Sequence, residues 1–172
     1  MDAPNSALAK NLGRYAEYHR DRRNVATHLV GIPMIVLAVE VLLSRPLWQV
    51  GALPVTPAII ASGAAAIFYL RLDLRFGLAM AGLLALGAWI GLILAQLSTA
   101  LWLGWGIGLF VAGWIIQFIG HGFEGRKPAF MDDLKSLLIG PLFVVAELAF
   151  LLGLRRELRD HVTRREAGRA AH

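Results

Sequence analysis

Five long apolar runs constrain the fold of this chain more than any other feature. A helix that crosses a bilayer needs about 20 mostly apolar residues, and these runs approach or reach that length. The chain is 57% hydrophobic and only 17% charged, which excludes an ordinary soluble domain. We predict an all-α, polytopic membrane helix bundle of four to five hydrophobic segments, which form a single membrane domain over residues 1–172. The runs cover residues 25–43, 55–70, 76–97, 101–120 and 137–154.

Basic residues indicate how the runs cross the membrane. Lys and Arg gather in cytoplasmic flanks, and the five in residues 1–24 predict a cytoplasmic N-terminus. Five full crossings would place the basic tail, residues 155–172, on the outside with its six arginines. An even number of crossings removes this conflict, so we expect residues 137–154 to be bent, re-entrant or a fifth span. That run is interrupted by Gly140-Pro141 and contains Glu147, whose carboxylate is costly in lipid.

The N-terminal segment is expected to lie along the membrane surface. In residues 7–20, a helix would gather its apolar residues and one histidine on one side. This pattern is typical of an interfacial amphipathic helix. A polar cluster at residues 21–24 follows and is suited to a corner before the first apolar run. The apolar side holds Leu8, Leu12, Tyr15 and His19.

The composition limits the chemistry that is available. The chain contains no cysteine, so disulfides, thiolate metal sites, iron–sulfur clusters and cysteine nucleophiles are excluded. Metal ligands must come from His, Asp and Glu. No glycine-rich phosphate-binding loop follows a strand, so a nucleotide cofactor is not expected. The net charge of +5 comes largely from the two tails and favours anionic membrane lipid, not nucleic acid.

Three histidines are expected to meet at the cytoplasmic surface. His19 and His28 flank the start of the first run, and His121 ends the fourth. A continuous helix would turn His19 and His28 to opposite sides, since nine residues rotate by about 180°, so a break at 21–24 is required. Imidazoles with one or two carboxylates suit non-haem iron, and also zinc or manganese. Glu124 is the nearest carboxylate and a possible further metal ligand, and Asp21 and Glu147 are the next candidates.

Other polar side chains stand at helical spacing from these histidines. An offset of four residues places two side chains one turn apart on the same face. Tyr15 and Asn24 precede two of the histidines by four residues, and Gln117 precedes the third. We expect these side chains and Glu147 to lie around the ligands and to orient them. For Gln117, a hydrogen bond that joins two helices is a simpler role.

Two cations follow the third histidine. Arg126 and Lys127 could anchor a substrate carboxylate, but the excess of basic residues at cytoplasmic flanks explains them without any function. His161 lies in the basic tail and His172 ends the chain. We treat both histidines as solvated.

The two histidine segments resemble a known family. The residues that carry the resemblance are Tyr15, His19, Asn24, His28, Gly31 and Pro33, then residues 117–129 with His121 and Glu124, and finally Gly140-Pro141 with Glu147. This pattern is similar to that of the Mpo1-like family and covers most of the chain. The resemblance implies an Fe(II)-dependent dioxygenase that shortens 2-hydroxy fatty acids by one carbon with O2 and releases carbon dioxide. It also implies that His19, His28 and His121 are the catalytic iron ligands.

The same resemblance implies the partners and the location. A 2-hydroxy fatty acid would present its hydroxyl and carboxylate to the iron, while its acyl chain lies among the spans, and O2 would be the second substrate. The chain looks like a bacterial member of the family. We therefore expect an integral protein of the bacterial inner membrane with a cytoplasmic N-terminus.

Other functions would use the same polar residues. A small transporter or proton relay could employ His28, His121 and Glu147, although ionisable residues that gather at one surface form no ladder across the bilayer. A haem protein could use two of the histidines as axial ligands. A purely structural membrane protein would leave the grouping of histidines unexplained, although a single interfacial histidine is usually satisfied by a backbone carbonyl or a lipid headgroup.

Overall fold

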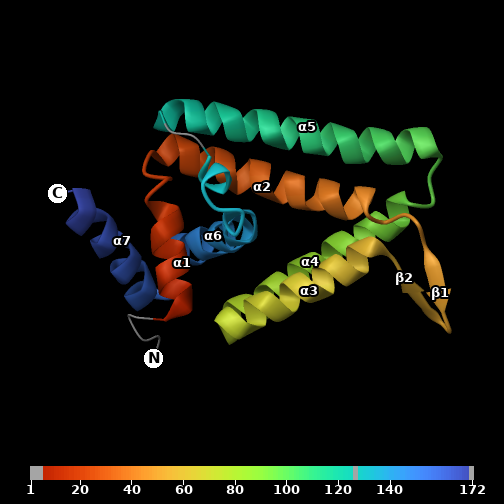
Figure 1. Cartoon of the computed structure of the whole chain (residues 1–172), viewed down its shortest axis with the longest axis horizontal. Coiled ribbons are helices and arrows are strands. Elements are labelled where there is room, and N and C mark those ends of the chain that lie inside the picture. The colour runs from red at the N-terminus through yellow and green to blue at the C-terminus, as the bar shows by residue number, and fades with distance from the viewer. Residues whose placement is uncertain (1–5, 126–127, 171–172) are drawn as a thin grey trace. The chain divides into compact units, whose positions relative to one another are not determined.

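The computed structural model describes residues 6–125 and 128–170, with the backbone alone for residues 164–170. Figure 1 shows that these residues are almost entirely helical, which confirms the predicted all-α membrane bundle. One short hairpin and one 3-10 turn, Ala129–Met131, interrupt the helices. The elements are α1 (Ala7–Ala16), α2 (Arg22–Leu42), β1 (Trp48–Val50), β2 (Leu53–Val55), α3 (Pro57–Leu72), α4 (Leu74–Leu94), α5 (Thr99–Glu124), α6 (Ser136–Leu151) and α7 (Arg156–Ala170).

Three of the helices, α2, α4 and α5, are long and apolar enough to cross a membrane. Helix α3 is apolar but shorter, and α6 with the start of α7 forms a pair bent by 115°. Helix α6 continues through Gly140-Pro141, so this interruption of the apolar run does not end the helix. Proline removes a single N–H donor, which bends a helix more often than it ends one. The chain turns instead at Gly153 and Arg155, whose φ angles are 73° and 54°.

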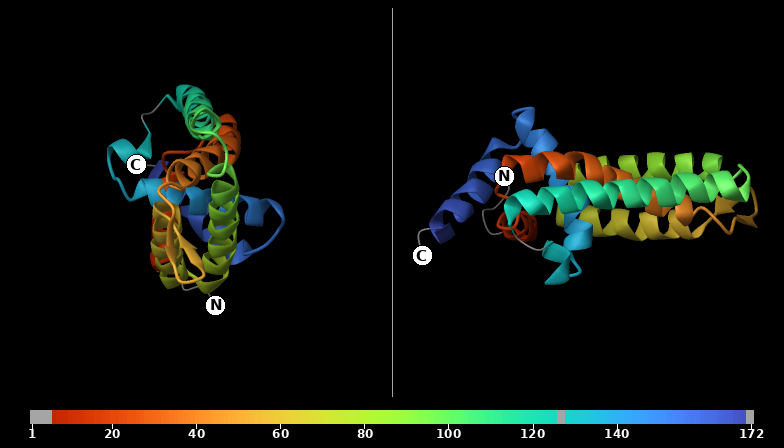
Figure 2. Two further views of the ribbon diagram at one scale, coloured as in Figure 1. Left: turned by 90° about the vertical axis from the view of Figure 1, so that its right-hand side faces the viewer. Right: turned by 90° about the horizontal axis from the view of Figure 1, so that it is seen from above.

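The described chain divides into two compact units. The first unit comprises residues Met1–Leu29 and Phe118–His172, and the second comprises Val30–Gln117. In the second unit, α3 and α4 lie side by side in both views of Figure 2. Asp73 alone joins them, and its carboxylate accepts a hydrogen bond of 2.9 Å from the Phe76 N–H at the start of α4. The hairpin β1–β2, which the sequence did not predict, precedes α3.

Small and polar residues connect the helices of the second unit. A Cβ on Gly31 of α2 would stand 2.9 Å from the Gly113 carbonyl oxygen of α5, so glycine permits close helix packing there. Glu40 of α2 is 5% exposed and accepts a hydrogen bond of 2.8 Å from the Ser62 hydroxyl of α3. A buried carboxylate in an apolar helix is thereby satisfied by a neighbouring helix.

In the first unit, α1 packs against α6 and α7. Its N-terminus is capped by the Ser6 hydroxyl, which accepts a hydrogen bond of 3.2 Å from the Ala9 N–H. The apolar side of α1 predicted from the sequence is buried, with Leu8 and Leu12 each 1% exposed. Leu142 and Phe143 of α6 are also buried. This packing fixes the end of α1, where the first histidine of the candidate site follows.

Candidate metal centre

A tight turn between α1 and α2 positions His19. The helix expected over residues 7–20 ends at Ala16, because the Tyr18 and His19 N–H groups turn back to carbonyls only three residues earlier. Helix α2 begins at Arg22. The chain is therefore broken between the two histidines, slightly before the predicted corner at 21–24, and His19 and His28 are free to face each other.

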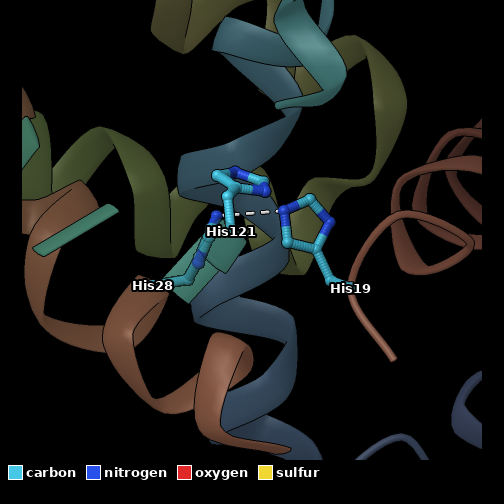
Figure 3. Close-up of side chains that lie close together, drawn as sticks. All are labelled: His19, His28 and His121. Atoms are coloured by element: carbon cyan, nitrogen blue, oxygen red, sulfur yellow. Dashed lines mark hydrogen bonds between the residues drawn. The ribbon is translucent and has the colours of Figure 1, made fainter. Parts of the chain in front are cut away.

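The three predicted histidines lie together in the first unit. His19, His28 and His121 are 3%, 1% and 7% exposed. Their potential ligand nitrogens all lie within 4.8 Å of one another, and the Nε2 atoms of His19 and His28 are 3.0 Å apart. Figure 3 shows the three rings turned toward one another. Within the described residues, this is the one group of three or more such side chains close enough to hold a metal ion.

Backbone carbonyls fix the tautomers of two of these rings. His19 Nδ1 lies 2.8 Å from the Tyr15 carbonyl oxygen, and His28 Nδ1 lies 2.8 Å from the Asn24 carbonyl oxygen. A carbonyl only accepts, so each Nδ1 carries the proton and donates it. In the neutral rings, both Nε2 atoms then present lone pairs across the 3.0 Å gap. Two facing lone pairs repel each other unless a cation lies between or beside them.

A proton is a poor candidate for that cation. Burial lowers the pKa of His19 to about 4, although its hydrogen bond to the Tyr15 carbonyl opposes the shift. A divalent metal ion fits better, since two imidazole nitrogens at about 2.1 Å on neighbouring coordination positions stand about 3 Å apart. His121 Nδ1 is buried without a hydrogen-bond partner, and a metal would satisfy an imidazole nitrogen of this kind. The donor set therefore fits a metal ion.

The spacing of His19 and His28 disfavours a haem bound between these two rings. Two axial histidines bind haem iron from opposite faces of the porphyrin, so their ligating nitrogens stand about 4 Å apart. The Nε2 atoms of His19 and His28 are only 3.0 Å apart. A porphyrin does not fit between them in this arrangement.

Tyr15 and Asn24 each contact the histidine that follows four residues later. The Tyr15 ring stacks on the His19 ring, with centroids 4.2 Å apart and planes inclined by 6°. Burial raises the pKa of the Tyr15 hydroxyl above its usual value, so it stays protonated. Asn24 is fully buried, and its carbonyl holds His28. Both residues orient imidazoles through main-chain carbonyls, which a sequence pattern of side chains does not reveal.

Glu124 lies beside the histidines but does not join their group. Its carboxylate accepts hydrogen bonds from the Arg20 N–H at 3.0 Å, from the Asp21 N–H at 2.9 Å and from Asn24 Nδ2 at 3.0 Å. These bonds tie the end of α5 to the turn after His19 and to the start of α2. These hydrogen bonds suit a role in positioning the turn after His19, and the possible ligand role of Glu124 stays a prediction.

The other predicted site residues lie elsewhere. Gln117 belongs to the second unit, where it is buried next to Gly31. Glu147 lies in the first unit on the wall of a cavity that His19 also lines. Arg126 and Lys127, the predicted substrate-binding cations, fall outside the described residues.

Gly120 is a site residue that the sequence did not single out for packing. A Cβ at this position would meet the Thr27 side chain and would stand 2.6 Å from Asn24 Oδ1. Helices α2 and α5 therefore approach closely in the first unit, one residue before His121. The sequence does show a glycine directly before the candidate ligand His121. Glycine is common in apolar helices, however, and by itself is weak evidence for close helix packing.

Comparison with known proteins identifies the family. The family model described as "2-hydroxy-palmitic acid dioxygenase Mpo1-like" matches residues 6–152. The chain belongs to the Mpo1-like family. A relative from Saccharomyces cerevisiae, named 2-hydroxy-palmitic acid dioxygenase MPO1, is 37% identical over 155 residues, which cover 88% of this chain and 85% of the yeast protein. No solved structure matches the chain.

Membership of the Mpo1-like family confirms the resemblance seen in the sequence. The matched region contains both histidine segments and the whole of α1 to α6, and it ends before α7. The three clustered histidines of this Mpo1-like chain therefore lie in the part that the family model describes.

Proposed function

We propose that this protein is an Fe(II)-dependent dioxygenase that catalyses the α-oxidation of 2-hydroxy fatty acids at a membrane surface. The name of the yeast relative supports the substrate class and the use of dioxygen. The observation that carries the proposal is the pair of Nε2 lone pairs held 3.0 Å apart, with a third buried imidazole beside them. Three neutral histidines also suit zinc, but a dioxygenase requires a metal that reacts with O2, which favours iron.

The overall reaction needs no further cofactor. A 2-hydroxy acid and one O2 give the acid with one carbon fewer, carbon dioxide and water. The substrate loses four electrons, and the four-electron reduction of O2 consumes them. When bound, ferrous iron supplies the site at which the substrate oxygens and O2 meet.

The residues of the chain hold this site in place. His19 and His28 can offer Nε2 to a metal ion because each Nδ1–H donates its hydrogen bond to a backbone carbonyl. Glu124 keeps the turn after His19 and the start of α2 together. The Tyr15 and Phe143 rings pack around His19 and exclude water from one side, with centroids 4.2 and 5.8 Å from its own. An all-histidine ligand set carries no negative charge, so a substrate carboxylate would complement the cation.

We also propose where the reaction takes place. A long-chain hydroxy acid partitions into membrane lipid, and the apolar helices of this chain belong in the same phase. The basic N-terminal segment favours the cytoplasmic side of a bacterial inner membrane, which places the histidines near the inner leaflet.

The test is a turnover assay with purified, iron-loaded protein. We expect 2-hydroxypalmitate to yield pentadecanoate with consumption of O2, whereas palmitate, which lacks the hydroxyl, should yield none. His28→Ala should abolish the reaction, and His161→Ala, which changes a histidine outside the cluster, should retain it. The absence of pentadecanoate together with unchanged O2 would refute the proposal.

A further inference from the structure

A cavity in the first unit has no role in the site described so far. Its volume is about 650 Å³, and His19 forms part of its wall. Cavities of this size hold small organic molecules. Its walls come from the turn before α2, the start of α2, and the helices α6 and α7. The cavity therefore begins at the candidate metal centre and extends along two helices of the same unit.

One wall of the cavity is apolar. Phe143 and Phe150 stand seven residues apart on α6, so both face the same side, and they are 3% and 8% exposed. The Phe143 ring centroid lies 5.8 Å from that of His19. Seven residues of helix rise about 10 Å, so the wall leads away from the histidines by about two helical turns. Val162 of α7, which is 4% exposed, adds to this wall.

Charged side chains also line the cavity. Three arginines and one carboxylate, Glu147, line the cavity, so cations outnumber anions. Arg20 directly follows His19 in the chain. Arg22 is exposed, and within the described residues it forms no ion pair. Arg159 shares its charge with Asp160 at 3.0 Å. An unpaired guanidinium at the edge of an apolar cavity favours a carboxylate ligand.

We infer that this cavity binds a fatty acid, with the acyl chain along the Phe143–Phe150 wall and the carboxylate drawn toward His19 by the arginines. The ligand chemistry follows from the combination of an apolar wall with an excess of cationic side chains in the lining, because a carboxylate amphiphile satisfies both. The cavity itself indicates only a fatty acid. That this fatty acid carries a 2-hydroxyl group rests on the proposed function. It assigns the substrate contacts to α6, α7 and Arg22, which differ from the predicted Arg126 and Lys127.

Photo-crosslinking tests the inference independently of turnover. The probe is a 2-hydroxy fatty acid with a diazirine near the end of its chain, added to the full-length, iron-loaded protein without O2. We expect labelled peptides from α6 and α7, and loss of labelling when 2-hydroxypalmitate competes. Labelling spread over the lipid-facing surfaces of α4 and α5, without competition by 2-hydroxypalmitate, would overturn the inference.

Paired variants sharpen the test. Leu151 lines the cavity and is 73% exposed, whereas its neighbour Leu152 is 77% exposed and does not line it. Leu151→Trp should reduce labelling several-fold, and Leu152→Trp should leave it unchanged. Arg22→Gln should weaken competition by the free acid, whereas Arg14→Gln, on the surface of α1, should not. Equal effects within both pairs would overturn the inference.

The outcomes separate this inference from the proposed function. Specific labelling of the cavity without formation of pentadecanoate would support the binding site and refute the reaction. Formation of pentadecanoate with labelling outside the cavity would support the reaction and refute the binding site.

Discussion

The Tyr15 carbonyl decides what His19 can do. By accepting the Nδ1 proton at 2.8 Å, it leaves the Nε2 lone pair directed at His28, and burial keeps that lone pair free of a proton. Histidine usually titrates near neutral pH, but here the folded chain opposes protonation. A metal-binding imidazole must be neutral, and the local structure keeps His19 in that form.

The stability of the metal-free protein should depend on pH through His19. Its pKa in the folded protein, about 4, lies below the ordinary value of 6.5, so the unfolded chain binds this proton more readily in that interval. We therefore expect the His19 contribution to be fully present above pH 6.5 and to be lost as the pH falls toward 4. Thermal unfolding of the wild-type protein and of His19→Gln between pH 4 and 7 measures how this contribution to stability changes with pH. Identical pH profiles for the two proteins would contradict the expectation.

Glu124→Gln should weaken metal binding without abolishing it. The neutral amide has one acceptor oxygen in place of two, so the contacts to the Arg20 and Asp21 N–H groups and to Asn24 cannot all persist. We expect a loss of about 1–3 kcal/mol in unfolding free energy and an iron affinity about 10–100 times lower, with wild-type occupancy restored by excess iron. Glu157→Gln, on the surface of α7, is the matched control. If excess iron fails to restore occupancy, Glu124 is a ligand after all.

At the scale of elements, close packing of α2 and α5 in the first unit brings His28 and His121 together. Gly120→Ala places a methyl group against Thr27 and Asn24, whereas a Cβ on Gly122 would meet nothing within 4 Å. We expect Gly120→Ala to lower both the unfolding temperature and the iron content. Gly122→Ala should be neutral, or stabilising by up to about 1 kcal/mol through helix propensity. Thermal unfolding and metal analysis of the two variants check this, and similar losses in both would show that Gly120 has no special role.

The sequence predicted most of these elements because each apolar run has the length of a membrane helix. It also predicted that His19 and His28 need a break between them, since a continuous helix would separate them. The exact break could not be predicted, because hydrogen bonds to the Tyr15 and Ala16 carbonyls end α1 early. The position of the bend after α6 could not be predicted either, because the sequence does not show that Arg155 adopts a left-handed conformation. The contacts of Glu124 were equally hidden, since two of its three partners are main-chain N–H groups.

At the scale of the whole molecule, the absence of cysteine makes the predicted topology directly testable. Ser98 lies in the exposed turn between α4 and α5, and Lys10 lies on the exposed side of α1. Each can be replaced by a single cysteine. With a cytoplasmic N-terminus, a membrane-impermeant maleimide should label Ser98→Cys in intact bacterial cells and Lys10→Cys only after lysis. The opposite pattern would contradict the predicted orientation.

The central claim is that three histidines distant in the sequence hold one metal ion. Iron content of His121→Ala, measured beside wild type and His161→Ala after identical loading and desalting, tests it most directly. His121 is in the cluster and His161 is not. We expect His161→Ala to retain wild-type iron and His121→Ala to lose most of it. Wild-type iron content in His121→Ala would show that His121 does not hold the metal ion.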